Sequence, residues 1–155
     1  MRKSVSIFAI VVCALLFRCV IYAEDRGPSM QLEAILVWGT NDEQSPDPNH
    51  KPLEPGIEAK LRNQPFKWKK YFEVNRQSTN LVAKAAAKLK MSQECEIEVL
   101  SRGDSTVEVT LIGKGQRVGT VVQPLPPGEL LVLGGNAPNM TGWFVVIRQR
   151  GKGSQ

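Results

Sequence analysis

Between residues 94 and 148, runs of alternating apolar and polar residues are separated by turns that contain glycine. In the first run, Cys95, Ile97 and Val99 share one side of an extended chain, and glutamates occupy the positions between them. A period of two residues is typical of a strand with one buried and one solvated face. This stretch therefore predicts a β core, around which the rest of the chain is organised.

Short turns divide this block into strands that we expect to pair with their neighbours. Residues 101–104 contain Gly103 and separate the first run from a second alternating run at 106–111. Two alternating runs joined by a short glycine-containing loop are typical of a β-hairpin. Residues 113–115 form a further glycine-containing turn before the segment 118–122, and we interpret it as a second hairpin turn.

The last part of the block predicts one crossing and two central strands. Residues 124–128 contain three prolines, and proline cannot donate a backbone hydrogen bond within a central strand. This segment therefore predicts a sheet edge or a crossing. The apolar runs at 130–133 and 143–147 are unbroken, as expected for strands that are covered on both faces, so we expect both to be central.

Two earlier segments also have the character of strands. Residues 31–38 are apolar enough to form a buried strand, and residues 66–74 place Phe66, Trp68 and Phe72 on one side with lysines mostly on the other. Interleaved aromatic residues and lysines can bind single-stranded nucleic acid. Their separation onto two faces favours a half-buried strand instead, and we expect no specific nucleic-acid partner.

One short helix and one ambiguous segment complete the expected elements. Residues 55–63 begin with proline and carry Ile57 and Leu61 four positions apart, which predicts an amphipathic helix that covers one end of the sheet. Residues 81–91 are rich in alanine, which favours a helix, but they also alternate strictly, which favours a strand. We follow the alternation and predict a strand.

The N-terminus has the pattern of a secretory signal peptide. Arg2 and Lys3 precede an apolar run at 5–17, and Ala23 offers a small residue for cleavage. The run is shorter than the roughly 20 residues that a membrane-spanning helix needs. We therefore expect a signal peptide at 1–23, an exported periplasmic or extracellular protein that does not span the membrane after cleavage, and a mature domain that begins at residue 24.

Charge is unevenly distributed along the expected mature chain. Residues 24–59 contain eight acidic and two basic residues, whereas residues 60–90 contain nine basic residues and one acidic residue. A basic block of this kind can bind an anionic partner such as a polymer, or it can be a solvated face that pairs with the acidic segment. The lysines that would form the binding surface are Lys67, Lys69, Lys70, Lys84, Lys88 and Lys90.

Catalytic and metal-binding patterns are weak. His50 is the only histidine, and it follows Asp47 in a polar, proline-containing loop at 41–50, so a hydrolase site would depend on how this loop is held. After signal cleavage Cys95 is the only cysteine left, which excludes an internal disulfide, and its place on an apolar strand face predicts a buried thiol. One histidine and one cysteine are too few for a typical zinc site. We therefore expect no metal site and no cofactor.

Three segments carry a resemblance to a known kind of protein. They are residues 36–41, residues 66–72, and the β block that ends at 130–135 and 143–146. Their order resembles small exported bacterial β-rich proteins of unknown function. The resemblance concerns packing and turn patterns over most of the mature chain, so it implies a bacterial exported protein and no particular site residue.

These observations predict a mainly β protein, an antiparallel β-sandwich of about seven strands with one short helix. We expect one β-rich domain at 24–148 and a disordered basic tail at 149–155. The favoured function is a non-catalytic envelope or extracellular binding or assembly module, whose unknown partner would be an envelope protein or an anionic polymer. The alternatives are a hydrolase that uses the acidic loop around His50 and a basic-patch binder of anionic polymers.

Overall fold

The computed structural model describes residues 29–137 and 140–151. The expected signal peptide at 1–23 and residues 152–155 of the expected tail lie outside the described residues. At the other end of the domain, β9 (Gly142–Gln149) includes the first residue of that expected tail. The backbone amide of Arg150 also donates a hydrogen bond to Gln31 O at 2.8 Å. The strand therefore extends one residue beyond the domain end predicted at 148, and its backbone hydrogen bonding continues to Arg150.

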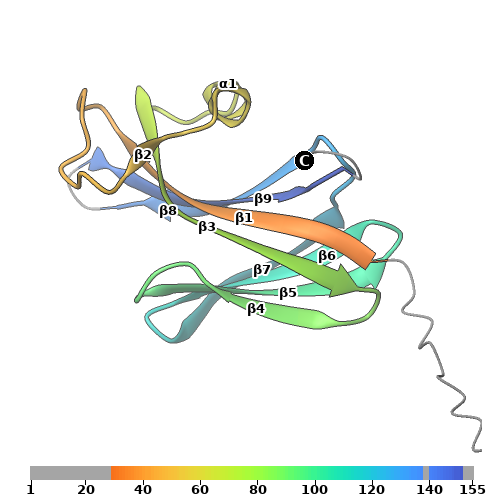
Figure 1. The fold of residues 1–155 in the computed structure, drawn as a ribbon. Helices are drawn as coiled ribbons and strands as arrows, with labels where there is room; N and C mark the ends of the chain where they lie inside the picture. Colours follow the sequence, from red (N-terminus) through yellow and green to blue (C-terminus); the bar gives the residue numbers. More distant parts are fainter. Residues whose placement is uncertain (1–28, 138–139, 152–155) are drawn as a thin grey trace, which may run out of the picture.

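Two antiparallel sheets pack face to face, with the helix on the outer side of the larger one (Figure 1). The prediction of a mainly β antiparallel sandwich with one short helix is confirmed, and the described residues form nine strands where about seven were expected. The five-stranded sheet has the order β2 (Lys51–Pro52), β3 (Lys70–Val82), β1 (Ser29–Thr40), β9 and β8 (Leu130–Asn136). The four-stranded sheet has the order β4 (Ala86–Lys90), β5 (Cys95–Gly103), β6 (Thr106–Gly113) and β7 (Gln116–Pro124).

The main core lies between the two sheets. Alternation along β1 directs Leu32, Ala34 and Leu36 toward the four-stranded sheet, as the period of two residues requires. Ile97 and Val99 on β5 meet them from the other side and are fully buried. The alternating block identified in the sequence therefore supplies the inner face of the second sheet, and its two expected hairpins are present as β5–β6 and β6–β7.

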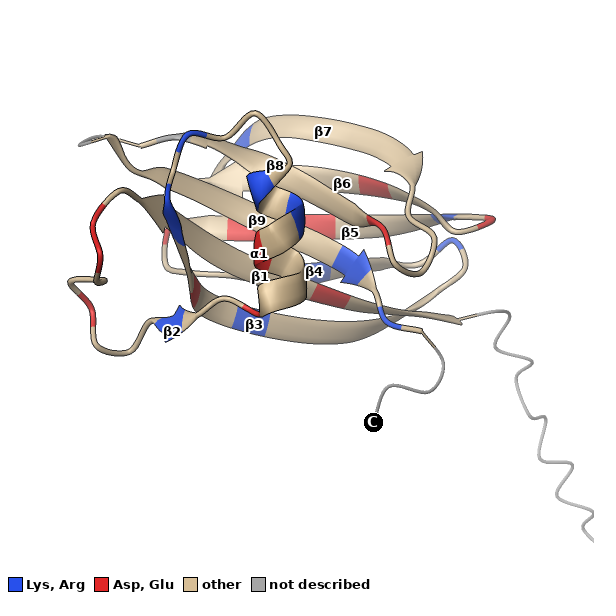
Figure 2. Ribbon diagram, turned by 90° about the horizontal axis from the view of Figure 1, so that it is seen from above, with Lys and Arg blue, Asp and Glu red and all other residues tan. Residues whose placement is uncertain are grey.

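A second, smaller core lies on the outer face of the five-stranded sheet. Helix α1 (Pro55–Arg62) buries Ile57 and Leu61 against it. The helix lies over β1 and β9 (Figure 2), which corrects the expectation that it would cover an end of the sheet. The physical reason is that alternate residues of β1, Ile35 and Val37, are also apolar, so this face needs cover from water.

The segment 66–74 differs from the single strand that was predicted. β3 begins only at Lys70, and Tyr71 is buried at 3% exposure, although the alternation placed it on the solvent side. Tyr71 is buried because it belongs to the second core, on the face that α1 covers. A β-bulge between β1 and β3 also adds one residue, Val74, to β3, so the alternation is broken at that point. Trp68 lies before the strand and donates its indole N–H to Met140 O at 2.7 Å.

Two further predictions are corrected in part. Residues 81–91 belong to two strands, β3 and β4, because the chain turns at Lys84, which has a positive φ of 63°. The expected alternation holds within the second of these strands, where Leu89 is buried and Lys88 is exposed. β9 is an interior strand as predicted, but β8 is an edge strand that pairs only with β9 in the described sheet. The apolar sequence of β8 indicated a central strand because both of its faces are covered. Only one of its two edges is paired.

Candidate functional site

An apolar cleft of about 620 Å³ opens at one end of the sandwich, between the two sheets. The sheets diverge toward this end, where β1 finishes and β5 starts (Figure 1). Leu36 and Val145 line the cleft from the five-stranded sheet, and Cys95, Leu111 and Val118 line it from the other. A cavity of a few hundred cubic ångströms with apolar walls has the size and character of a small-molecule site.

Glycine residues on β8 create part of this space. Gly134 and Gly135 both line the cleft. A β-carbon at Gly134 would collide with the backbone oxygen of Trp143 and lie 2.9 Å from Phe144 Cα, so only glycine fits. A β-carbon at Gly135 would have no atom within 4 Å. The second glycine therefore leaves open volume that a larger residue would fill.

An aromatic residue and a valine stand at the open side of the cleft. Trp143 is 41% exposed and Val118 is 66% exposed, which is unusual for large apolar side chains in a folded domain. Val118 reaches the cleft because a bulge in the β6–β7 ladder places it as an extra residue between Arg117 and Gly119. Large exposed apolar residues beside an apolar cavity are typical of a binding surface.

A hydroxyl and backbone groups at the cleft are already used by the turns that carry them, and the charged side chains in its lining, Glu94 and Lys114, are exposed. Ser92 Oγ accepts hydrogen bonds from the backbone amides of Glu94 and Cys95 at 3.2 and 3.0 Å. The backbone amide of Lys114 donates to Glu94 O at 2.8 Å. Burial raises the pKa of the Cys95 thiol, so the thiol is neutral at pH 7. The walls therefore suit an uncharged apolar ligand better than a charged one.

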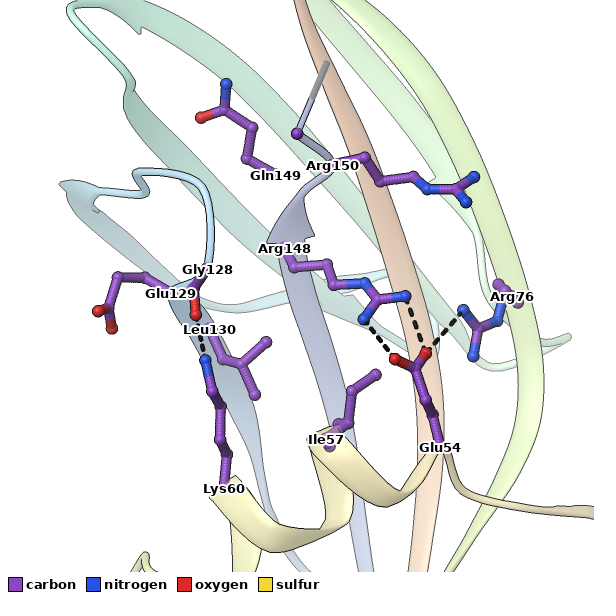
Figure 3. A pocket seen from close by; sticks show the side chains of 12 residues that line it. Glu54, Ile57, Lys60, Arg76, Gly128, Glu129, Leu130, Arg148, Gln149 and Arg150 are labelled. Atoms are coloured by element: carbon purple, nitrogen blue, oxygen red, sulfur yellow. Dashed lines mark hydrogen bonds and ion pairs between the residues drawn. The ribbon is translucent and has the colours of Figure 1, made fainter. Parts of the chain in front are cut away.

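A second cavity, of about 550 Å³, lies beside α1 and has charged walls (Figure 3). Arg148 and Arg76 converge there on Glu54, the residue that precedes the helix. Arg148 also donates from Nε to Glu33 at 2.6 Å, and Arg76 lies 2.9 Å from the same carboxylate. Glu33 is only 2% exposed, so two guanidinium groups compensate one buried charge.

The charged cavity is better explained as a structural clamp than as an anion site. Hydrogen bonds from Arg148 hold the pKa of Glu54 below its usual range, and the same bonds raise the pKa of Arg148. Arg76 makes two further bonds to Glu73, at 3.1 and 2.6 Å. Both guanidinium groups are thus occupied by carboxylates of the chain, which join α1, β1, β3 and β9. An incoming anion would have to displace them.

The polar loop at 41–50, in which the alternative hydrolase site would lie, brings three side chains together. Ser45 Oγ lies 2.7 Å from His50 Nδ1, and His50 Nε2 lies 3.6 Å from Asp47 Oδ2. The ring of Trp38 packs edge-on against His50 with centroids 5.8 Å apart. The same side chains also accept hydrogen bonds from backbone amides of the loop. Ser45 Oγ accepts one from Asp47 N at 3.2 Å. A hydrogen bond from the backbone amide of Asn49 lowers the pKa of Asp47. The contacts therefore also serve to fold the loop.

The six lysines predicted to bind an anionic partner fall into two groups. Lys70 begins β3 and Lys84 lies in the turn beyond its far end, with a strand of 13 residues between them. Lys70 lies 3.3 Å from Glu43, and Lys88 lies 3.3 Å from Glu96. The first group is Lys67, Lys69 and Lys70, and the second is Lys84, Lys88 and Lys90. The structure does not bring all six onto one surface.

Comparisons with known proteins identify no relative. No protein-family model matches the chain, and neither a curated protein nor a solved structure is significantly similar to it. The described ranges, 29–137 and 140–151, contain no helix long and apolar enough to cross a membrane. Within the same ranges, no group of three or more acidic, histidine or cysteine side chains is placed to hold a metal ion.

No prediction from the sequence pointed to the apolar cleft. Cys95 was expected to be an ordinary buried thiol on an apolar strand face. A glycine pair next to an aromatic strand was the available signal, because glycine inside a strand often marks a place where space is kept open. The exposure of Trp143 and Val118 depends on how the two sheets diverge, which no local pattern encodes.

Proposed function

We propose that this protein is a non-catalytic binding module of the cell envelope or the extracellular space, and that the apolar cleft is its ligand site. The observation that carries this proposal is the cavity of about 620 Å³ between the sheets, with mainly apolar walls. The expected signal peptide supplies the location. The ligand class that fits is a small, uncharged, apolar molecule.

The architecture of the cleft supports binding without reaction. Its walls are strands of both sheets, so the cavity is built on a hydrogen-bonded framework rather than on long loops. Cys95, the thiol in its lining, is half-buried, and burial raises the pKa of that thiol. A neutral thiol is a poor nucleophile. Binding would instead gain free energy from the apolar surface that Trp143 and Val118 expose.

Titration with the neutral fluorophore N-phenyl-1-naphthylamine tests this function. Protein purified from cells that express the full chain is expected to give a saturable rise in fluorescence. The variant Gly135→Leu fills the open volume of the cleft and should weaken binding at least about tenfold.

The matched control is Gly56→Leu, at a helix position where an added β-carbon also meets no atom within 4 Å and which lies in the charged cavity. This variant should bind the fluorophore like the wild type. Absence of saturable binding, or equal affinity in Gly135→Leu, would contradict the proposal.

A second candidate function, hydrolysis at the acidic loop, is favoured by one contact. His50 Nδ1 lies 2.7 Å from Ser45 Oγ, which is within the distance at which a histidine can accept the proton of an attacking serine. Turnover of p-nitrophenyl esters by the purified protein, compared between the wild type and Ser45→Ala, tests it. Activity that Ser45→Ala abolishes would support a hydrolase, and activity that it leaves unchanged would exclude this serine as the nucleophile.

A further inference from the structure

The four edges of the described sheets differ in how well they are protected. Edge strands present unpaired backbone groups, and soluble proteins usually shield them with lysine, with proline or by making them short. β2 has two residues and includes a proline. β4 has five residues and carries the exposed Lys88 and Lys90. By these criteria β2 and β4 are protected against pairing with another chain, whereas β8 has seven residues without a charge or a proline.

β7 is a long edge strand that lacks this protection. It has nine residues, and seven of them are exposed. No charged residue lies between Val118 and Pro124, and Figure 2 shows the strand uncoloured along most of its length. Val118 and Val122 are 66% and 56% exposed, which places both among the exposed large apolar residues of the described chain. β-Branched residues on an open edge favour pairing with another strand.

The charges near the two ends of β7 favour an antiparallel partner of the same sequence. Arg117 lies at the start of the strand, and Asp104 lies in the turn beside its end, where Thr106 pairs with Pro124. Both side chains are exposed, and neither forms an ion pair within the described ranges. A two-fold axis near the middle of β7 would place the basic end of each copy beside the acidic end of the other.

We propose that β7 is a dimerisation edge, at which two copies of this chain pair in antiparallel orientation to form one continuous eight-stranded sheet. The axis lies between Thr120 and Val122, so the uncharged part of the strand faces its own copy. Pro124 limits the ladder at its end because it has no amide hydrogen to donate. Val118 also lines the apolar cleft, so the second copy lies beside the cleft's open side. This inference does not depend on the proposed ligand.

Charge substitution at Val122 tests the dimer independently of its exact register. Sedimentation velocity of the wild type should show a dimer that dissociates on dilution. Val122→Lys and Val122→Glu each place like charges across the axis and should raise the dimer dissociation constant at least about tenfold. An equimolar mixture of the two variants, one of them uniformly labelled with ¹⁵N, should form heterodimers, which native mass spectrometry then resolves by mass.

Ala86 supplies the matched control, because it is exposed on the opposite edge strand, β4. Ala86→Lys and Ala86→Glu should dimerise like the wild type, and circular dichroism should show the same strand content in all four variants. A wild type that stays monomeric at the highest concentration would overturn the proposal. So would a dimer that persists unchanged in both Val122 variants, since it would form through another surface.

Discussion

Arg148→Met removes one of the two guanidinium groups that compensate the buried carboxylate of Glu33. Methionine keeps an unbranched apolar side chain in place, so the change acts mainly on charge and hydrogen bonding. Three hydrogen bonds are lost, one to Glu33 at 2.6 Å and two to Glu54 at 3.0 and 2.9 Å. The substitution therefore tests whether the clamp beneath α1 contributes to folding.

The magnitude follows from the exposure of the two acceptors. Glu33 has a side chain that is 3% exposed, and a hydrogen bond to such a charged group contributes about 1.5–3 kcal/mol. Glu54 has a side chain that is 43% exposed, so its ion pair adds about 0–1 kcal/mol. Arg76 remains 2.9 Å from Glu33, which prevents the larger loss of about 3–5 kcal/mol expected for an unpaired buried charge. We expect Arg148→Met to lower the free energy of unfolding by about 2–3 kcal/mol.

Equilibrium urea unfolding at pH 7, followed by circular dichroism, measures this difference. The control is Arg102→Met, which removes an ion pair with Glu108 from a side chain that is 54% exposed, and it should cost only about 0–1 kcal/mol. If Arg148→Met fell within about 0.5 kcal/mol of Arg102→Met, the reasoning that the buried carboxylate depends on Arg148 would be refuted.

The same pair of proteins gives a signature in pH. Hydrogen bonds from Arg148 lower the pKa of Glu54 in the folded state, so this group stabilises the fold when it is ionised. The contribution is complete above the usual glutamate pKa of about 4.3 and is lost as the pH falls through the lowered pKa of Glu54. The difference in unfolding free energy between the wild type and Arg148→Met should therefore shrink between pH 7 and pH 3.

Three further changes test other parts of the structure. Gly134→Ala forces a β-carbon into the backbone of β9 and should lower the free energy of unfolding, measured by thermal denaturation, by about 1–3 kcal/mol. In Gly135→Ala the new β-carbon meets no atom within 4 Å, so the loss should be far smaller. Equal losses in the two variants would contradict the close approach at Gly134. Leu125→Ala, at a fully buried position where the chain crosses between sheets, should lower the free energy of unfolding by about 2–5 kcal/mol, and a loss comparable to that of an exposed site would show that the crossing is not packed. Burial raises the pKa of the Cys95 thiol, so iodoacetamide should alkylate Cys95 in the folded protein more slowly at pH 7 than it alkylates glutathione. Mass spectrometry of the peptide that contains Cys95 measures the rate. Alkylation as fast as that of glutathione would mean that the thiol is not buried.

The sandwich could be predicted because its strands alternate. Ile97, Val99, Val107 and Val109 are all fully buried between the sheets, and their spacing of two residues requires no knowledge of the partner sheet. The two hairpin turns were equally local, since glycine lies at or beside each turn. Helix α1 was predictable from its first-turn proline and from the four-residue spacing of its two buried side chains.

The errors arise where one residue changes the register or where two sheets set the outcome. Tyr71 was expected on a solvated face, but α1 covers that face and makes it a second core. The bulge that inserts Val74 breaks the alternation of β3, and no local pattern distinguishes a bulged strand from a regular one. The sequence of β8 is apolar without interruption because Leu131 contacts one core and Val132 contacts the other, so it indicated a central strand. Its open edge depends on the order of strands in the sheet, which is a property of the whole chain.

The candidate site was less accessible to sequence analysis than the fold. Lysines at 70 and 84 were grouped because they are near in sequence, but β3 separates them. The loop at 41–50 was correctly expected to be polar, yet the contact between Ser45 and His50 depends on how the loop folds back. The cleft requires residues from seven strands of the two sheets, so only the assembled sandwich reveals it.

The most direct test of the proposed function is to map where an apolar ligand binds. A ¹H–¹⁵N correlation spectrum of the isotopically labelled protein, titrated with N-phenyl-1-naphthylamine, reports each backbone amide and the Trp143 indole. The proposal predicts saturable shifts at Trp143, Val118, Gly134 and Gly135, which line the cleft, and none around the charged cavity at Glu54. Shifts confined to other surfaces, or no shifts at saturating fluorophore, would contradict the proposal that this cleft is the binding site.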